Sequence, residues 1–353
     1  MKKIFLVIPS LKAGGAERVM AFIAENLSKE KFKPVLIVVG FEKDQVYPVN
    51  NVEVIFLNKQ RVSKSVFPLM ALIRREKPQV VMSSIGHLNT IIALIAFFFR
   101  KTKFVAREAN VASVRKQFSE KRKNTIKINP KKSLFKFLDV IVCQSNDMYQ
   151  DVLKEFPNLK SKMTIINNPV NDQFQLKKSS PKKEGIISFI TVGALHKRKG
   201  HDRILRVLSK INYPYKYFIL GSGKEKDNIF NLAESLGVAK NITHVPYTSE
   251  VSKYLSQSDF YLQGSYVEGF PNAVIESCAV GTPVIAFNAP GGINEIISPM
   301  INGYVAQTEE EFFTYLKAGL NNKYSPLEVR NVVLEKFGKE KIITAYEELF
   351  TNI

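Results

Sequence analysis

Residues 265–281, SYVEGFPNAVIESCAVG, place two carboxylates eight positions apart on either side of a Gly-Phe-Pro-Asn turn. The carboxylates are Glu268 and Glu276, and Asn272 in the turn is a favourable helix N-cap. A helix that begins there, or one residue later, would direct its unpaired first-turn N–H groups at the loop that carries Glu268. Such a helix end attracts anions and sugar hydroxyls. The stretch therefore predicts a polar ligand site, although an ordinary capped helix with two solvated glutamates would have the same spacing.

On both sides of this stretch, short apolar runs alternate with helix-compatible segments. The predicted strands are 4–8, 35–39, 52–57, 80–83, 104–106 and 140–143 in the first half, and 186–192, 217–220, 242–245, 260–262 and 284–287 in the second. Continuous apolar runs are typical of strands that are buried on both faces of a parallel sheet. The alternation predicts an α/β protein with two doubly wound domains, in which ligands bind beyond the carboxyl ends of the strands.

The length of 353 residues exceeds what one core usually supports, which favours two domains. The predicted domains are 1–170 and 186–335, joined by a linker at 171–185 that is rich in Asn, Pro, Ser and Lys. The last segment, 336–353, is predicted to be a helix that packs back on the first domain, because it has an apolar face.

Glycine-rich turns follow the first predicted strand of each half. Gly14 and Gly15 follow the strand at 4–8, and a plain turn would have the same sequence. In the second half Gly193 begins a turn that carries the basic cluster 196–199. Cations and backbone N–H groups at the start of a helix are typical of phosphate sites.

The net charge of +19 is uneven along the chain, with 30 basic and 14 acidic residues up to residue 175 and 21 and 18 after it. A basic first half indicates an anionic partner.

The two cysteines, Cys143 and Cys278, form no disulfide or zinc pattern and favour a reducing compartment. No secretory signal opens the chain, and the apolar run at 90–99 is about half a membrane span. We therefore expect a cytoplasmic protein.

Four motifs together resemble glycosyltransferase family 4 over nearly the whole chain. They are LKAGGAERV (11–19), NNPVN (167–171), VGALHKRKG (192–200) and SYVEGFPNAVIE (265–276). The resemblance implies a GT-B fold, with two Rossmann-like domains that face each other across a cleft. It also implies a retaining transfer of a sugar from a nucleotide sugar to an acceptor held by the first domain.

The resemblance assigns roles to individual residues. Glu268 would lie beside the reacting face of the donor sugar, and Glu276 would bind the ribose. Lys199 would neutralise the leaving diphosphate. Further donor contacts would come from Gly14, Gly15, Gly193, Gly269, Phe270, Pro271 and Asn272. Fixed cations and N–H donors that point at developing charge lower a reaction barrier.

The chain departs from the family pattern at two places. The family's phosphate-loop arginine is replaced by Ala194, so either His196, Lys197 or Arg198 compensates or stabilisation of the leaving group is weakened. Arg198 is favoured because its guanidinium can bind a phosphate bidentately, although it suits a solvated surface as well. The family's histidine near the cleft is absent from 106–110, which leaves His87 as the candidate, with a core or capping role as the alternative. Tyr247 is a candidate for stacking on the base, and UDP is favoured over GDP.

The basic segment from 100 to 136, interleaved with apolar residues, suits an anionic membrane surface. The predicted membrane or acceptor contacts are Arg115, Lys116, Lys121, Arg122 and Lys123. We thus expect a metal-independent enzyme, peripheral to the inner face of the cell membrane, that glycosylates a lipid-linked or growing surface glycan. A sugar-nucleotide epimerase of the same fold, or a nucleic-acid-binding protein that uses the basic half, are the alternatives.

Overall fold

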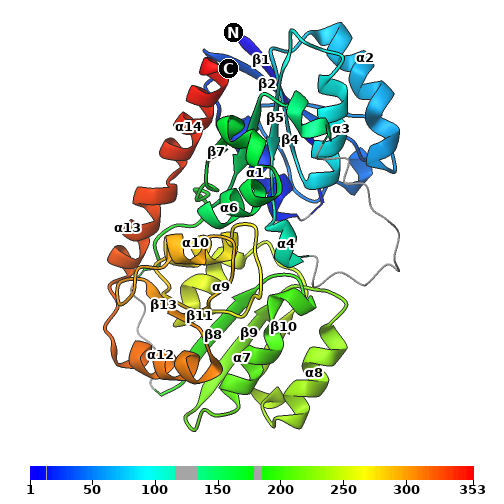
Figure 1. Cartoon of the computed structure of the whole chain (residues 1–353). Helices are drawn as coiled ribbons and strands as arrows, with labels where there is room; N and C mark the ends of the chain where they lie inside the picture. Colours follow the sequence, from blue (N-terminus) through cyan, green and yellow to red (C-terminus); the bar gives the residue numbers. More distant parts are fainter. Residues whose placement is uncertain (13, 116–132, 179–184) are drawn as a thin grey trace. The chain divides into compact units, whose positions relative to one another are not determined.

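The computed structural model, which describes residues 1–12, 14–115, 133–178 and 185–353, divides into two α/β units (Figure 1). Unit 1 comprises Met1–Ala112, residues of 120–169 and Glu340–Ile353, and the main body of unit 2 is Val170–Lys339. The chain passes into the main body of unit 2 after residue 169 and returns to unit 1 after residue 339, so its C-terminal helix belongs to unit 1.

Within the described residues, unit 1 has a seven-stranded, all-parallel sheet of order β3-β2-β1-β4-β5-β6-β7. Its strands are β1 (Lys2–Ile8), β2 (Phe32–Val38), β3 (Glu53–Phe56), β4 (Val80–Ser84), β5 (Lys103–Arg107), β6 (Val140–Cys143) and β7 (Met163–Ile165). Its helices are α1 (Gly15–Asn26), α2 (Val66–Glu76), α3 (Gly86–Ala96), α6 (Asn146–Glu155) and α14 (Lys339–Asn352), with 3-10 turns η1 (Glu42–Asp44), η2 (Val62–Ser65), η4 (Phe135–Phe137) and η5 (Pro157–Lys162). A short helix, α4 (Ala112–Arg115), follows β5. The strand order reverses between β1 and β4, so the loops after these two strands meet at one place.

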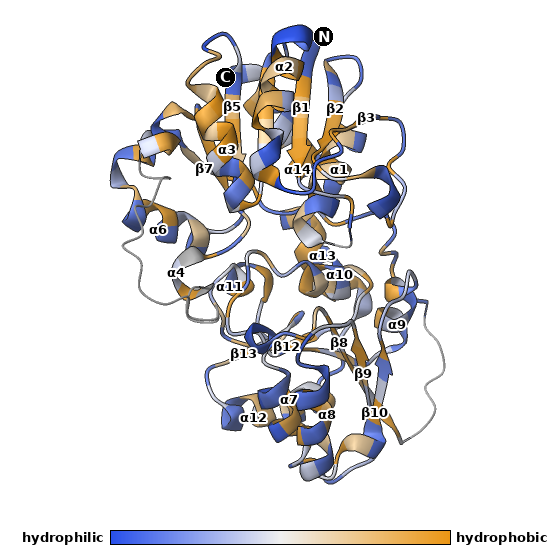
Figure 2. Cartoon of the chain, turned by 90° about the vertical axis from the view of Figure 1, so that its right-hand side faces the viewer, coloured by the Kyte–Doolittle hydropathy of each residue, from blue (hydrophilic) through white to orange (hydrophobic). Residues whose placement is uncertain are grey.

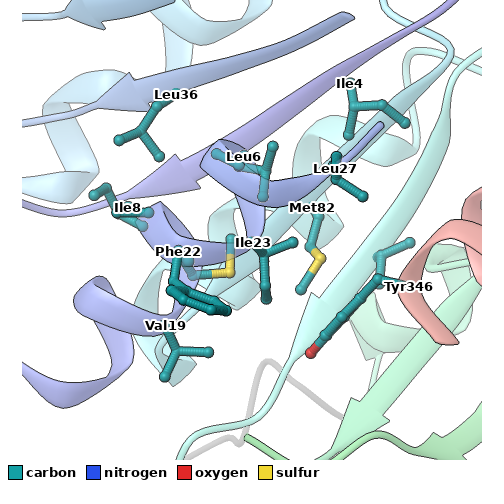
Figure 3. Close-up of a cluster of buried hydrophobic side chains, with 14 of the residues drawn as sticks. Ile4, Leu6, Ile8, Val19, Phe22, Ile23, Leu27, Leu36, Met82 and Tyr346 are labelled. Carbon is teal, nitrogen blue, oxygen red and sulfur yellow. The ribbon is translucent and has the colours of Figure 1, made fainter. Parts of the chain in front are cut away.

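Helix α14 packs into the hydrophobic core that α1 and the sheet of unit 1 form. Figure 3 shows Phe22 and Ile23 of α1 among Leu6 of β1 and Met82 of β4, with the ring of Tyr346 entering the same cluster from α14. Tyr346 is fully buried and accepts a hydrogen bond from Arg107 over 3.1 Å. The apolar face of the last segment is thus buried in unit 1.

Unit 2 repeats the architecture with a six-stranded parallel sheet among the described residues, in the order β10-β9-β8-β11-β12-β13. Its strands are β8 (Ile187–Val192), β9 (Tyr215–Leu220), β10 (Ile242–Val245), β11 (Phe260–Gln263), β12 (Val284–Phe287) and β13 (Gly303–Ala306). Its helices are α7 (His201–Leu208), α8 (Lys226–Ser235), α9 (Val251–Gln257), α10 (Asn272–Ala279), α11 (Ile293–Ile296), α12 (Glu309–Asn321) and α13 (Pro326–Phe337), with 3-10 turns η6 (Lys197–Lys199) and η7 (Ala239–Asn241). Here the order reverses between β8 and β11. The two doubly wound domains expected from the sequence are confirmed.

Three boundaries differ from the sequence-based expectation. The predicted linker at 171–185 is not free at its start, because Val170 and Phe174 are buried in the core of unit 2 and the amide of Lys177 donates to Val280. The predicted C-terminal helix at 336–353 is the single helix α14, which begins later, at Lys339, because α13 runs to Phe337 and Gly338 separates the two. The short outer strands β7 and β13 were not predicted.

In the ranges described, every helix falls short of the length and apolar content that a membrane span requires. Figure 2 shows the hydrophobic colour concentrated on the inner strands, such as β1, and on α3.

Candidate functional site

Two loops of unit 2 meet where the strand order reverses, because β8 and β11 are neighbours in the sheet. The loop after β8 carries the basic cluster, and the loop after β11 carries Glu268. Their backbones touch: a Cβ at Gly200, where φ is +57°, would lie 2.0 Å from the carbonyl oxygen of Gly264. The amide of Tyr266 also donates to the carbonyl of Arg198 over 2.8 Å. The phosphate-loop candidate and the first glutamate are therefore held together by the topology.

Glu268 is buried, with 7% of the residue exposed, and its carboxylate accepts several hydrogen bonds. Lys199 Nζ lies 2.5 Å from Oε1, Ser265 Oγ donates to the same oxygen over 2.5 Å, and the amide nitrogen of Gln263 does so over 3.0 Å. Arg198 adds its charge 3.8 Å from Oε2. A buried carboxylate is stable when its charge is paired and its lone pairs are used, and both conditions hold here.

Burial alone would raise the pKa of Glu268 by penalising its charged form. The charges of Lys199 and Arg198, and hydrogen bonds from Lys199 and Ser265, outweigh that penalty, so the pKa of Glu268 lies below its ordinary value. Glu268 is therefore an anion at neutral pH. It suits stabilisation of positive charge at the sugar, or acceptance of a hydrogen bond from a sugar hydroxyl, better than donation of a proton.

A half-buried arginine fixes the loop that carries Glu268. Arg203 of α7 donates from Nε to the carbonyl of Gly264 over 2.5 Å and from its terminal nitrogen to the carbonyl of Ser265. Its guanidinium lies 4.1 Å from the ring centre of Tyr266 and 4.0 Å from that of Phe287. Sequence analysis missed Arg203, because on the sequence it is one more cation on an amphipathic helix.

A second set of missed residues holds Glu268 from the strand side. Gln263 ends β11, and its side-chain oxygen accepts a hydrogen bond of 3.1 Å from Tyr261, whose hydroxyl also lies 3.1 Å from the carbonyl oxygen of Val192. A buried glutamine at the end of an otherwise apolar strand was the available signal.

Helix α10 starts at Asn272, as expected, but its N-cap differs from the prediction. Asn272 is the first helical residue, Pro271 occupies the N-cap position, and no side chain caps the helix. The expected row of unpaired N–H groups is also incomplete, since Asn272 donates to the carbonyl of Phe270 and Val274 to that of Pro271. Proline is suited to a helix start because it has no N–H to satisfy.

The remaining donor-site candidates of unit 2 lie around this centre. The ring of Phe270 is buried against Phe337, with ring centres 5.3 Å apart, so only its backbone faces the loop. Gly269 is buried beside it, and Glu276 is half-buried one turn into α10. Gly193 lies against Lys199, since an added Cβ would be 3.5 Å from that side chain.

The basic cluster divides into two pairs with different surroundings. Arg198 and Lys199 approach Glu268, whereas His196 and Lys197 line a separate cavity of about 410 Å³ between α7 and α8. Of the cations considered as replacements for the arginine missing at Ala194, Arg198 is therefore the one placed beside Glu268 and Lys199. Tyr247 follows β10 and is 67% exposed, so its ring is accessible for the predicted stacking.

Unit 1 places its candidate residues at its own reversal point. Gly14 is the N-cap of α1, Gly15 begins that helix, and His87 lies at the start of α3 after β4. His87 is exposed and lines a cavity of about 700 Å³. Ile85, before α3, has φ of +80°, which is strained for a β-branched residue and is typical of functional corners.

Arg107 and Glu108, which occupy the segment where the family has a histidine, are structural. Arg107 is fully buried and donates to Ser84, Asn168 and Tyr346. Glu108 is 5% exposed and accepts from the amide of Asn89 over 3.2 Å. Their contacts tie β4 and α14 together within unit 1.

Two further predictions, the membrane contact and the metal-independent chemistry, are not tested by the described residues. The backbone of Arg115 ends α4, whereas its side chain and the residues Lys116, Lys121, Arg122 and Lys123 lie outside the described part of the structure. The described residues contain no cluster of three or more His, Cys, Asp or Glu side chains with a metal-binding arrangement. The membrane contact and the metal-independent chemistry stay predictions.

Comparison with known proteins identifies the two units. A family model described as Glycosyltransferase Family 4 matches residues 13–174, and one described as Glycosyl transferases group 1 matches residues 172–332. An uncharacterized glycosyltransferase of Haemophilus influenzae is 27% identical over 98% of this chain and 99% of its own length.

A Campylobacter jejuni protein, N-acetylgalactosamine-N,N'-diacetylbacillosaminyl-diphospho-undecaprenol 4-alpha-N-acetylgalactosaminyltransferase, is 26% identical over 88% of this chain and 87% of its own length. Among solved structures, Anabaena HepE in complex with UDP-glucose has a TM-score of 0.79 at 13% identity, with full coverage of both chains. At that identity the likeness shows the fold alone, which is GT-B. Because the two family models together match residues 13–332, the chain belongs to the group 1, family 4 glycosyltransferases and is itself a glycosyltransferase.

Proposed function

We propose that this enzyme transfers a sugar, with retention at the anomeric carbon and without a metal ion, from a UDP-sugar to a lipid-linked or growing surface-glycan acceptor at the cytoplasmic membrane face. The observation that carries the donor part is the cluster of Lys199, Arg198 and Glu268 at the reversal point of unit 2. The Campylobacter relative, whose name gives a diphospho-undecaprenol-linked acceptor, and HepE, which was solved with UDP-glucose, support the acceptor and donor classes.

The chemistry follows from where charge develops during transfer. As the bond between the sugar and the diphosphate breaks, negative charge grows on the leaving diphosphate and positive charge grows at the anomeric carbon. Lys199 and Arg198 are the cations that stabilise the first, and the carboxylate of Glu268 is the anion that stabilises the second. Charges fixed in a buried site need no reorganisation during reaction, which makes them effective in catalysis. With two cations in place, the chain's own residues do the work of a divalent ion.

The family assignment favours transfer over the epimerase and nucleic-acid alternatives. A sugar-nucleotide epimerase would need more acid and base groups than Glu268 and its cationic neighbours offer. The basic first half of the chain is accounted for by an anionic acceptor and membrane surface.

Thermal stabilisation by a panel of nucleoside diphosphates tests the donor part. A ligand that binds only the native state raises stability by about 2.7 kcal/mol at a hundredfold excess over its Kd. We expect UDP to raise Tm more than GDP or ADP does. Equal or absent shifts with all three would contradict the UDP assignment.

Transfer assays with Glu268→Gln test the site. We expect this variant to lose transfer while keeping its fold, with Glu250→Gln as the matched control, because Glu250 is an exposed glutamate whose ion-pair partner among the described residues is the nearby Lys253. Wild-type-like turnover in Glu268→Gln would refute the assignment.

A further inference from the structure

The cavity of unit 1 has a cationic lining. It lies at the carboxyl ends of β1 and β2 and reaches η2 and the start of α3. Lys12, Lys59 and Arg61 line it together with His87, and the acidic residue of the lining is Asp44. Asp44 lies 3.6 Å from Lys12, so these two charges offset each other. Among the described residues, Lys59 and Arg61 take part in no ion pair, which leaves the cavity with a positive balance.

An apolar stripe leads out of this cavity along α3. His87 and Ile91 line the cavity, and Leu94 follows on the same face of α3, because positions three and four apart lie above one another. Phe98 lies in the turn directly after the helix. Leu94 is 39% exposed and Phe98 58% exposed. The helical part of the stripe, from His87 to Leu94, is about 10 Å long at the rise of an α-helix. Helix α3 is coloured hydrophobic over most of its length (Figure 2).

The far end of the stripe is aromatic with basic neighbours. The ring centre of Phe97, which is 48% exposed, lies 5.0 Å from those of Phe98 and Phe137. Lys136 lies 5.1 Å from the ring centre of Phe137, and Arg100 is exposed just beyond the helix. Aromatic rings beside cations are typical of surfaces that contact the headgroup region of a bilayer. Phe67, at the start of α2 directly after the cavity-lining η2, is 81% exposed.

We propose that this cavity and stripe form the acceptor subsite, and that its ligand is an amphiphile with a phosphate or diphosphate head and an isoprenoid or alkyl chain. The head binds in the cavity against Lys59 and Arg61, and the chain lies along Ile91, Leu94 and Phe98 towards the aromatic end. A hydrophilic acceptor would leave the stripe exposed to water, and a plain lipid tail would leave the two cations without a partner. The inference rests on the proposed function, since it names the acceptor class of the same enzyme.

Calorimetric titration of the full-length protein with farnesyl diphosphate, inorganic diphosphate and farnesol tests this subsite. We expect farnesyl diphosphate to bind more tightly than either part alone. The double substitution Lys59→Ala/Arg61→Ala should weaken its binding at least tenfold, because both cations that face the diphosphate head are removed. Phe98→Ser should weaken farnesyl diphosphate binding about tenfold and leave diphosphate binding unchanged.

Matched controls keep the result specific. Lys240→Ala removes an exposed cation of unit 2, and Leu327→Ser removes a 54% exposed apolar side chain of α13; both should bind farnesyl diphosphate like the wild type. Lys199→Met should also retain this binding, because its diphosphate contact is assigned to unit 2. Hydrolysis of the nucleotide sugar without acceptor should persist in the unit 1 variants, so failure of this subsite differs from failure of the proposed function.

Two results would overturn the inference. One is unchanged farnesyl diphosphate binding in both unit 1 variants. The other is vesicle binding that depends on Phe98 and on anionic phosphatidylglycerol, with no saturable binding of farnesyl diphosphate, which would make the surface a membrane contact rather than an acceptor subsite.

Discussion

Replacing Lys199 by methionine is the sharpest test of the donor site, because it removes a charge and keeps the length of the side chain. Lys199 Nζ lies 2.5 Å from Glu268 Oε1, with the two side chains 19% and 9% exposed. Removing one partner of a buried ion pair usually costs about 3–5 kcal/mol of folding stability. Since Ser265, Gln263 and Arg198 still face the carboxylate, we expect a cost at the lower end, about 3 kcal/mol.

The loss of transition-state stabilisation should be similar in free energy to the loss of folding stability, but it has a different physical cause. Loss of one fixed donor to developing negative charge lowers kcat about 10²–10³-fold. The assay is transfer from the nucleotide sugar that gives the largest thermal shift, with circular dichroism to verify the fold. Lys210→Met is the control, because the ion pairs of Lys210 within the described residues are long surface pairs, at 3.8–4.0 Å, with Glu309 and Glu310.

A pH profile separates an electrostatic role for Lys199 from a merely structural one. Lys199 lowers the pKa of Glu268, so its removal should move the acidic limb of the rate profile to higher pH. Turnover within about threefold of the wild type, or an acidic limb that does not move in a folded Lys199→Met enzyme, would refute the assignment of Lys199 to the leaving group.

Three further predictions concern other parts of the chain. Arg203→Met should destabilise unit 2 by about 3 kcal/mol and weaken UDP binding in calorimetry, because two carbonyls of the Glu268 loop lose their charged donor. Arg203→Lys should restore only part of the UDP affinity. Unchanged UDP affinity in Arg203→Met would contradict this role. Burial, with a contribution from the charge of Lys199, lowers the pKa of His201 from 6.5 to about 4, so the unfolded chain binds a proton in that window that the native state does not. Stability should therefore fall by up to about 3 kcal/mol as pH is lowered from 6.5 to 4, and thermal unfolding of His201→Gln should lack this loss. Charge reversal at residues 121–123 should weaken sedimentation with anionic liposomes and leave nucleotide affinity unchanged; unaltered liposome binding would remove the membrane role of that segment.

The inner strands were predictable because their signal is local. A strand covered on both faces must be apolar at every position, and β1 (Lys2–Ile8) has a continuous run from Ile4 to Ile8 that is fully buried. The outer strands β7 and β13 carry no such run, since Met163–Ile165 and Gly303–Ala306 are short and partly exposed. These strands form by pairing with the edge of a sheet that the other strands build. The sequence of the strand itself does not indicate that pairing.

Lys199 and Glu268 of the candidate site were predictable from the sequence, whereas the residues that hold them in place were not. Lys199 and Glu268 were found because each stands in a motif directly after a predicted strand, and parallel topology brings such loops together. Arg203, Gln263 and Ser265 were missed because their roles depend on contacts with backbone or with Glu268 that form only in the folded unit. The linker was misjudged for the same reason: Phe174 lies in a polar stretch, and only the fold shows that unit 2 buries it.

The hydrogen bonds around Glu268 explain how Lys199 can serve two partners. Lys199 neutralises a buried carboxylate that would otherwise be costly. In the proposed reaction Lys199 must also face the diphosphate, which draws its charge away from Glu268. Because Ser265 and Gln263 donate to the same oxygen, Glu268 keeps two hydrogen bonds and its position when that happens. Turning Lys199 towards the diphosphate therefore costs less free energy than breaking a buried ion pair outright. The hydrogen bonds from Ser265 and Gln263 account for this difference, and in that way they favour binding of the nucleotide sugar.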